Sequence, residues 1–229
     1  MVIRNRLASL LYRALEVALA IYTLVATFAS PLRDVRPIAY FSTEADLFVC
    51  IIVILAFVFN LIDLIRHGIH GIAAYVYMPL TFAGVVYLVS EAIGYWTLYP
   101  LVHGVPWADG MALATLLSHL ALPLVIFLGW LLFDEKGTVR WRHTLYYLVF
   151  PLFYIVYSEL AHSIFQDNFF PYEIMKPSFY TGFTSFLSGN GGWNGSITVM
   201  SCVLLAFLLI SSALTLLSNV LAGKYRRNH

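Results

Sequence analysis

The chain has little of what soluble proteins depend on: only 11% of its 229 residues are charged, and it contains two cysteines and three lysines. A soluble domain has about 25% charged residues, so this composition argues against a water-soluble fold. The lysines, Lys136, Lys176 and Lys224, all lie outside the long apolar runs. This disfavours a retinal protein, whose Schiff base needs a lysine within a helix. Cys50 and Cys202 provide neither a disulfide framework nor metal-ligand spacing. A net charge of +1 gives no indication of nucleic-acid binding.

Apolar residues make up 61% of the chain and aromatic residues 16%, with a mean hydropathy of +0.82. A hydrocarbon core of roughly 30 Å is crossed by about 20 helical residues. The sequence therefore predicts an all-α polytopic membrane protein, a six-transmembrane-helix bundle that forms a single domain over residues 1–229. The predicted helices lie near 7–30, 44–65, 72–96, 109–133, 141–163 and 197–221.

The basic residues predict the orientation of the bundle, because Lys and Arg accumulate on the cytoplasmic side of a membrane. With the N-terminus inside, the outer loops carry only Arg33, Arg36 and Lys176. The cytoplasmic segments then carry Arg4, Arg6, Arg66, Lys136, Arg140, Arg142, Lys224, Arg226 and Arg227. We therefore expect both termini to be cytoplasmic. The expected location is a plasma or inner membrane in a bacterium, or an endomembrane in a eukaryote.

Ionisable side chains at membrane depth are costly unless they face the bundle interior, a partner or water, so each is a candidate functional residue. They are Arg13, Glu16, Glu44, Asp46, Glu91, His119, Glu159 and His162. Arg13 and Glu16 are three residues apart, which puts them on one helix face and predicts an ion pair. Asp63 and Arg66 have the same spacing and predict a similar pair.

Several of these residues should converge near the outer leaflet. In the predicted topology the second helix enters there just after Thr43, and the third and fifth helices leave just after Glu91 and Glu159. His119 lies about ten residues into the fourth helix, which places it roughly 15 Å deep. Pro123 follows four residues later, frees a backbone carbonyl and allows a bend that can aim the imidazole inward.

The segment YFSTEADLF begins the second apolar run with two hydroxyls and two carboxylates. A helix N-cap accounts for one of each, because a cap hydroxyl accepts a first-turn N–H and a carboxylate suits the helix dipole. The others could be a nucleophile and a carboxylate directed at His119, since Thr43 and Asp46 share a helix face.

Three motifs resemble the androgen-induced and androgen-dependent six-transmembrane proteins and their bacterial counterparts. FSTEADL at 41–47 resembles the start of that family's second helix, with Thr followed three residues later by Asp. HLALPLVIFLGWLLFDEKGTVRW at 119–141 resembles the bacterial His-x-x-x-Pro helix and basic loop. YSELAHSIFQDNFFPYEIM, which includes Tyr172, resembles an aromatic motif of the bacterial members.

Animal members of this family are intramembrane hydrolases of fatty acid esters of hydroxy fatty acids. The resemblance implies that Thr43 is the nucleophile and His119 the base, whereas the bacterial pattern favours Ser42 as nucleophile. It implies no cofactor, and membrane lipids as both environment and substrate. In this hypothesis Asp46 orients His119. The supporting or substrate-binding candidates are Glu91, Glu159, His162 and Tyr172.

Two other interpretations use the same residues. His119, His162, Glu159, Glu91 and Asp46 could supply ligands to zinc, although no HExxH spacing supports this. Alternatively, a proton- or cation-coupled transporter or a lipid-binding membrane protein could use the acidic and His residues as a relay. The sequence lacks the internal repeats and paired broken helices common in transporters.

Overall fold

The computed structural model describes residues 2–29, 37–74, 77–103, 113–165 and 192–227. Within these ranges the regular structure is helical, apart from an isolated bridge between Asn5 and His70. The helices are α1 (Arg6–Ala29), η1 (Pro37–Ala39), α2 (Phe41–His67), α3 (Met78–His103), α4 (Leu113–Leu116), the π-helix η2 (Leu117–Ala121), α5 (Leu122–Phe133), α6 (Arg142–Tyr146), α7 (Val149–Phe165) and α9 (Gly192–Arg227).

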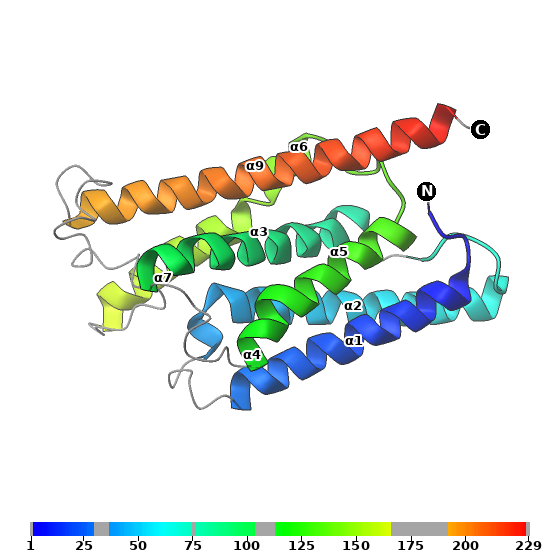
Figure 1. Cartoon of the computed structure of the whole chain (residues 1–229), viewed down its shortest axis with the longest axis horizontal. Coiled ribbons are helices and arrows are strands. Elements are labelled where there is room, and N and C mark those ends of the chain that lie inside the picture. The colour runs from blue at the N-terminus through cyan, green and yellow to red at the C-terminus, as the bar shows by residue number, and fades with distance from the viewer. Residues whose placement is uncertain (1, 30–36, 75–76, 104–112, 166–191, 228–229) are drawn as a thin grey trace.

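Five of the described helical stretches are long and apolar enough to cross a membrane, which gives the chain the character of a multi-pass membrane protein. They are Arg6–Ala29, Phe41–His67, Met78–Thr97, Leu113–Phe133 and Ser196–Gly223. When α7 is counted with these five stretches, successive helices run in alternating directions, and α1 begins at the end of the bundle where α9 ends (Figure 1). The start of α1 and the end of α9 therefore lie at the same end of the bundle. That this end faces the cytoplasm stays a prediction.

The segment predicted as a continuous helix over 141–163 is interrupted. It forms α6 and α7, which are separated by a turn at Tyr147 and Leu148. Pro151 lacks the backbone N–H that would donate to the carbonyl of Tyr147 in a regular helix, and this accounts for the break. α7 has 17 residues and is shorter than the five long stretches.

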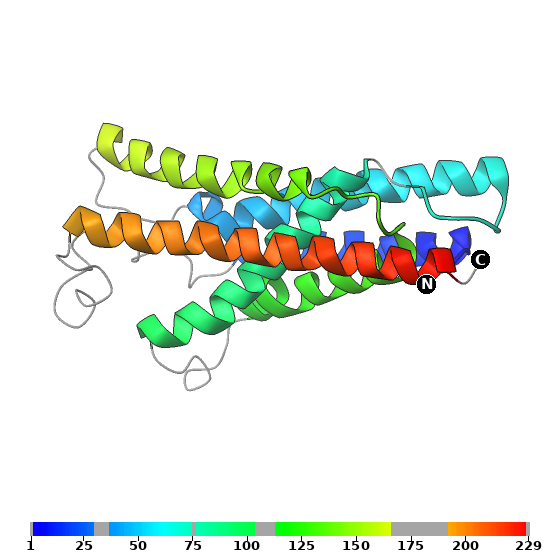
Figure 2. The ribbon, with the colours of Figure 1, turned by 90° about the horizontal axis from the view of Figure 1, so that it is seen from above.

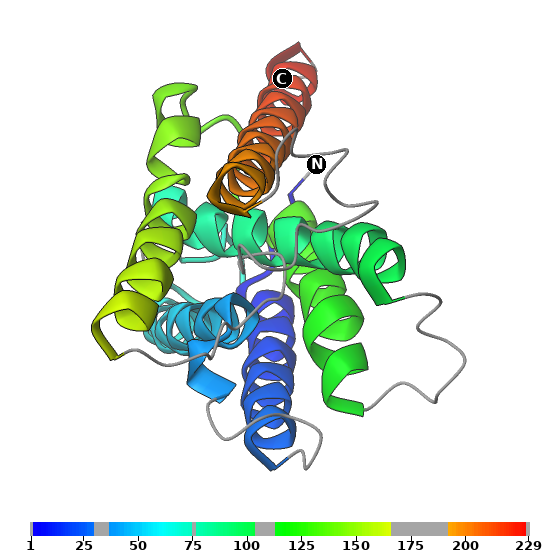
Figure 3. The ribbon, with the colours of Figure 1, turned by 90° about the vertical axis from the view of Figure 1, so that its left-hand side faces the viewer.

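α3 is the central helix of the bundle. Every residue from Thr81 to Leu88 is buried, and a helix that is apolar on all sides is expected in a core. α3 packs against α2, α5, η2 and α9. Figure 3 shows it passing between α9 on one side and the α1–α2 pair on the other, and in Figure 2 it crosses α9. Side chains on α3 can therefore reach several helices at once.

An aromatic cluster fixes the start of α2. The ring of Phe41 contacts those of Tyr87 on α3, Phe150 and Tyr154 on α7, and Phe207 on α9, with centroids 5.2–6.4 Å apart. The Tyr154 hydroxyl also donates to the carbonyl of Ala39 at 2.7 Å. Such edge-on and tilted ring pairs stabilise a fixed packing. The residues that follow Phe41 are thereby held against the centre of the bundle.

The other end of α2 corrects one predicted ion pair. Asp63 pairs with Nε of Arg6 at 2.5 Å and with Nδ1 of His67 at 2.6 Å, so the predicted partner Arg66 was wrong. The reason is that Arg6 N donates to the Ile69 carbonyl and Gly71 N donates to the Arg4 carbonyl. These bonds bring the start of α1 to the end of α2.

Candidate functional site

The hydroxyls at the start of α2 are not helix caps. The N-cap residue is Tyr40, and it makes no side-chain capping hydrogen bond. Ser42 and Thr43 lie inside the first turn with 3% and 0% of their surfaces exposed, and Asp46, one turn later, is fully buried. Glu44 is only half-buried. Capping therefore does not explain the buried polar residues Ser42, Thr43 and Asp46, which face the bundle interior.

Four buried polar side chains from three helical segments form a continuous chain. Ser118 on η2 donates to Oδ2 of Asp46 on α2 at 2.6 Å, and its Oγ lies 3.2 Å from Oε1 of Glu91 on α3. The same Oε1 lies 2.7 Å from Nδ1 of His119. All four residues are at most 9% exposed. The chain thus brings together the predicted residues Asp46, Glu91 and His119.

The carboxylate beside the imidazole is Glu91. Asp46, which the sequence suggested for this place, contacts Ser118 in the described structure. A carboxylate next to Nδ1 favours the proton on that nitrogen, which leaves the lone pair on Nε2, and this tautomer can act as a general base. The contact between Glu91 and His119 therefore resembles the carboxylate–histidine pairs used in nucleophilic catalysis.

The backbone around His119 departs from a regular helix. Residues Leu117–Ala121 form a π-turn, in which Leu122 N donates to the carbonyl of Leu117, and Pro123 follows in the next turn. Single π-turns are common at functional sites. The inward direction of His119, predicted from Pro123, agrees with its burial at 7% exposed.

Two neighbouring aromatic residues on α3 hold His119. The Tyr95 ring stacks on the imidazole with centroids 4.0 Å apart and planes inclined by 17°. The indole N–H of Trp96 donates to the backbone carbonyl of His119 at 2.9 Å. Tyr95 and Trp96 were not predicted, and neither was Ser118. The signal for Ser118 was its place directly before His119 on a mostly apolar helical stretch.

The remaining predicted site residues are Glu159, His162 and Tyr172. Glu159 is half-buried on α7. The side chain of His162 and all of Tyr172 lie outside the described residues. Among the residues that are described, no group of three or more His, Cys, Asp or Glu side chains is arranged to hold a metal ion.

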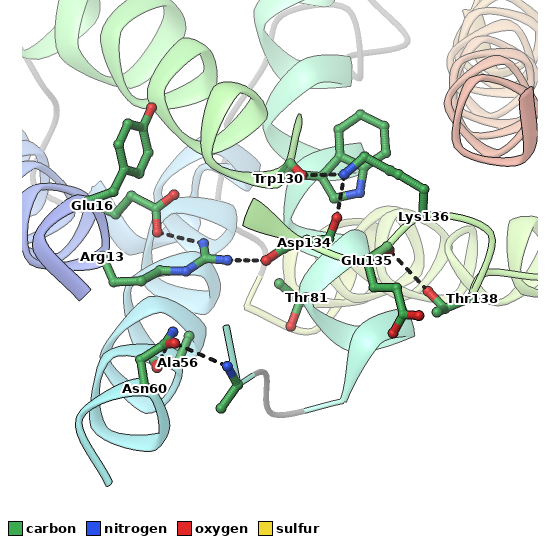
Figure 4. Close-up of polar contacts among 12 residues, drawn as sticks. Arg13, Glu16, Ala56, Asn60, Thr81, Trp130, Asp134, Glu135, Lys136 and Thr138 are labelled. Carbon is green, nitrogen blue, oxygen red and sulfur yellow. Dashed lines mark hydrogen bonds and ion pairs between the residues drawn. The ribbon is translucent and has the colours of Figure 1, made fainter. Parts of the chain in front are cut away.

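A second buried cluster connects α1 with the end of α5. Figure 4 shows the guanidinium of Arg13 between the carboxylates of Glu16 and Asp134. The predicted Arg13–Glu16 ion pair is confirmed at 2.7 Å, and Asp134 is an additional partner. The three side chains are at most 3% exposed.

Lys136 lies at the edge of this second cluster. Its ammonium donates to the Trp130 carbonyl at 2.6 Å and lies 4.6 Å from the centre of the Trp130 ring. Burial raises the pKa of the Asp134 carboxyl, and burial lowers the pKa of Lys136 to about 8. A cation at the carbonyl end of α5 also suits the helix dipole. We interpret this cluster as a structural connection between α1 and α5.

The chain was also compared with known proteins. No protein-family model, curated protein or solved structure gives a significant match.

Proposed function

We propose that the protein is an intramembrane serine/threonine-type hydrolase of fatty acyl esters. The proposal depends chiefly on one observation, the 2.7 Å contact between Glu91 and Nδ1 of His119. This contact lies in the buried interior of the bundle, which the hydroxyls of Ser42 and Thr43 on α2 also face. An imidazole oriented by a carboxylate is what a hydroxyl requires to become a nucleophile near neutral pH. The resemblance of FSTEADL and HLALP to the family of intramembrane hydrolases supports the same proposal.

In this mechanism Thr43 Oγ1 attacks the acyl carbonyl carbon while Nε2 of His119 takes the hydroxyl proton. Glu91 stabilises the imidazolium at Nδ1. The protonated His119 then gives its proton to the leaving alkoxide oxygen, which departs as an alcohol and leaves an acyl ester on Thr43. Water, deprotonated by His119, hydrolyses this ester to the fatty acid and restores Thr43.

Three local features favour Thr43 as the nucleophile. It is fully buried, and it lies one helical turn before Asp46, whose carboxylate contacts the residue next to His119. Thr43 also lies in the first turn of α2, and N–H groups at a helix N-terminus can stabilise the developing oxyanion. Ser42 and Ser118 are the alternative hydroxyls, at 3% and 0% exposed.

Turnover of a long-chain acyl ester by the detergent-purified chain tests the proposal. Thr43→Ala, His119→Ala and Glu91→Gln should each lower kcat/KM by at least about 100-fold, because acid–base catalysis typically contributes 10²- to 10⁴-fold. Thr215→Ala is the matched control, because Thr215 is a fully buried threonine on α9. Turnover by folded His119→Ala equal to that of the control would refute the mechanism.

A proton-coupled transporter is the second candidate, favoured by the chain Asp46–Ser118–Glu91–His119. Hydroxyl, carboxyl and imidazole groups in hydrogen-bond contact can pass protons. If transport is the function, the chain reconstituted in vesicles will move protons in response to a substrate gradient, and Ser118→Ala will stop this movement. A hydrolase without transport will show turnover and no proton flux.

A further inference from the structure

The backbone carbonyl of His119 has an unusual donor. In a regular α-helix it would accept the N–H of the residue four positions later, but that residue is Pro123, which has none. The indole N–H of Trp96, on a different helix, donates to this carbonyl at 2.9 Å. A side chain on α3 thus supplies a hydrogen bond that the proline removes from the helix of His119.

Trp96 belongs to a set of three α3 residues that contact His119. Glu91 pairs with its Nδ1, Tyr95 stacks on its ring, and Trp96 binds its carbonyl. Glu91 and Tyr95 are four residues apart and lie on one face of α3, whereas Trp96, next to Tyr95, lies further round the helix. One helix thereby fixes the imidazole at its ring edge, its ring face and its backbone.

The backbone contact has a separate role from the two ring contacts. Pro123 and the π-turn over Leu117–Ala121 loosen the local helix, because both remove regular hydrogen bonds. A helix loosened in this way can rotate or shift along its axis. The Trp96 bond ties this part of the backbone to the central helix α3 at the residue that carries the imidazole.

We propose that Trp96 is a positioning residue that replaces the backbone donor removed by Pro123 and sets the position of His119 relative to Glu91. The structural part of this inference is independent of the reaction. Its catalytic consequence depends on the proposed hydrolase function. A carbonyl contact does not touch the reacting atoms, so Trp96 acts through His119.

A double-mutant cycle tests the proposal on the full chain in detergent, with Trp96→Phe, Pro123→Ala and the double variant. Phe keeps the ring and loses the N–H. Trp96→Phe alone should lower the unfolding midpoint by about 4 °C, the effect expected for one lost buried hydrogen bond in a chain of this size. In the Pro123→Ala background the loss should be less than half as large, because the introduced alanine provides a backbone N–H.

The matched control is Trp141→Phe, which removes an indole N–H from an exposed side chain. The inference would be overturned if Trp96→Phe lowered the unfolding midpoint equally in both backgrounds. It would also be overturned if Trp96→Phe lowered the midpoint no more than Trp141→Phe does. If Trp96→Phe fails to fold, recovery of folding in the double variant supports the proposal and failure to recover overturns it.

A second measurement separates positioning from stability. We would follow the pH profile of His119 carbethoxylation by mass spectrometry in folded protein, and expect its midpoint to shift in Trp96→Phe but not in Trp141→Phe. Unchanged profiles in both would contradict a positioning role. If the wild-type chain lacks esterase turnover while the effects of Trp96→Phe and Pro123→Ala on the unfolding midpoint are coupled, the proposed function fails and the positioning inference stands. If the cycle is additive, the inference fails whatever the turnover.

Discussion

Gly129 on α5 is predicted to be intolerant of any side chain, because it packs against the Arg13–Glu16 pair. A Cβ at this position would overlap Oε1 of Glu16 and lie 2.9 Å from Cε1 of Tyr12. Glu16 cannot move aside freely, since its Oε2 is held by Arg13 at 2.7 Å. Gly129→Ala therefore forces the carboxylate away from its buried partner.

Two opposing effects set the magnitude. Replacing Gly by Ala in a helix contributes about 1 kcal/mol of stability. Overpacking costs about 1–3 kcal/mol, and breaking a buried ion pair costs about 3–5 kcal/mol when one partner is lost entirely. A partly displaced Glu16 should leave Gly129→Ala about 2 kcal/mol less stable than the wild type, which corresponds to a fall of about 4–8 °C in the unfolding midpoint.

Gly94→Ala is the matched control, because Gly94 lies within α3 and a Cβ there meets no atom within 4 Å. The assay is thermal unfolding of both variants in the same detergent. Gly94→Ala should be as stable as the wild type or slightly more stable. A Gly129→Ala variant as stable as Gly94→Ala would refute the packing argument.

Three further predictions concern the buried polar groups, and thermal unfolding in detergent measures each. Arg13→Met should destabilise the chain by about 3–5 kcal/mol, because two buried carboxylates lose their cation; an effect below about 1 kcal/mol would contradict this. Ser118→Ala should cost about 1–3 kcal/mol, since Asp46 loses a donor. Unfolded lysine keeps its proton to about pH 10.4, whereas the pKa of buried Lys136 is about 8. Stability should therefore rise between about pH 8 and 10, and Lys136→Met should remove this rise.

Local spacing along the chain predicted part of the structure. The apolar runs indicated the long helices, the spacing of Arg13 and Glu16 indicated their ion pair, and Pro123 indicated the inward direction of His119. The long helices depend on the length of each apolar run. The ion pair and the direction of His119 depend on residues within one or two helical turns of each other, where the periodicity of a helix fixes which side chains are neighbours.

Contacts between helices were less accessible to prediction. Asp134 lies 121 residues from Arg13, and Ser118 lies 72 residues from Asp46. Such pairs depend on how the helices rotate and shift against each other, which apolar runs do not specify. The same limitation explains Asp63: spacing suggested Arg66, but the docking of α1 provides Arg6. Glu91 was placed in the correct group of residues, while its contact with His119 required the position of α3.

Labelling with a lipophilic fluorophosphonate, followed by mapping of the modified peptide, tests the proposed hydrolase most directly. Folded wild-type chain should carry the adduct on Thr43, and labelling should disappear in Thr43→Ala and in His119→Ala while Thr215→Ala remains labelled. An adduct on Ser42 or Ser118 that depends on His119 would keep the mechanism and change the nucleophile. No adduct in folded wild-type chain, or an adduct that persists in His119→Ala, would contradict the proposal that Glu91 and His119 activate a hydroxyl in this membrane protein.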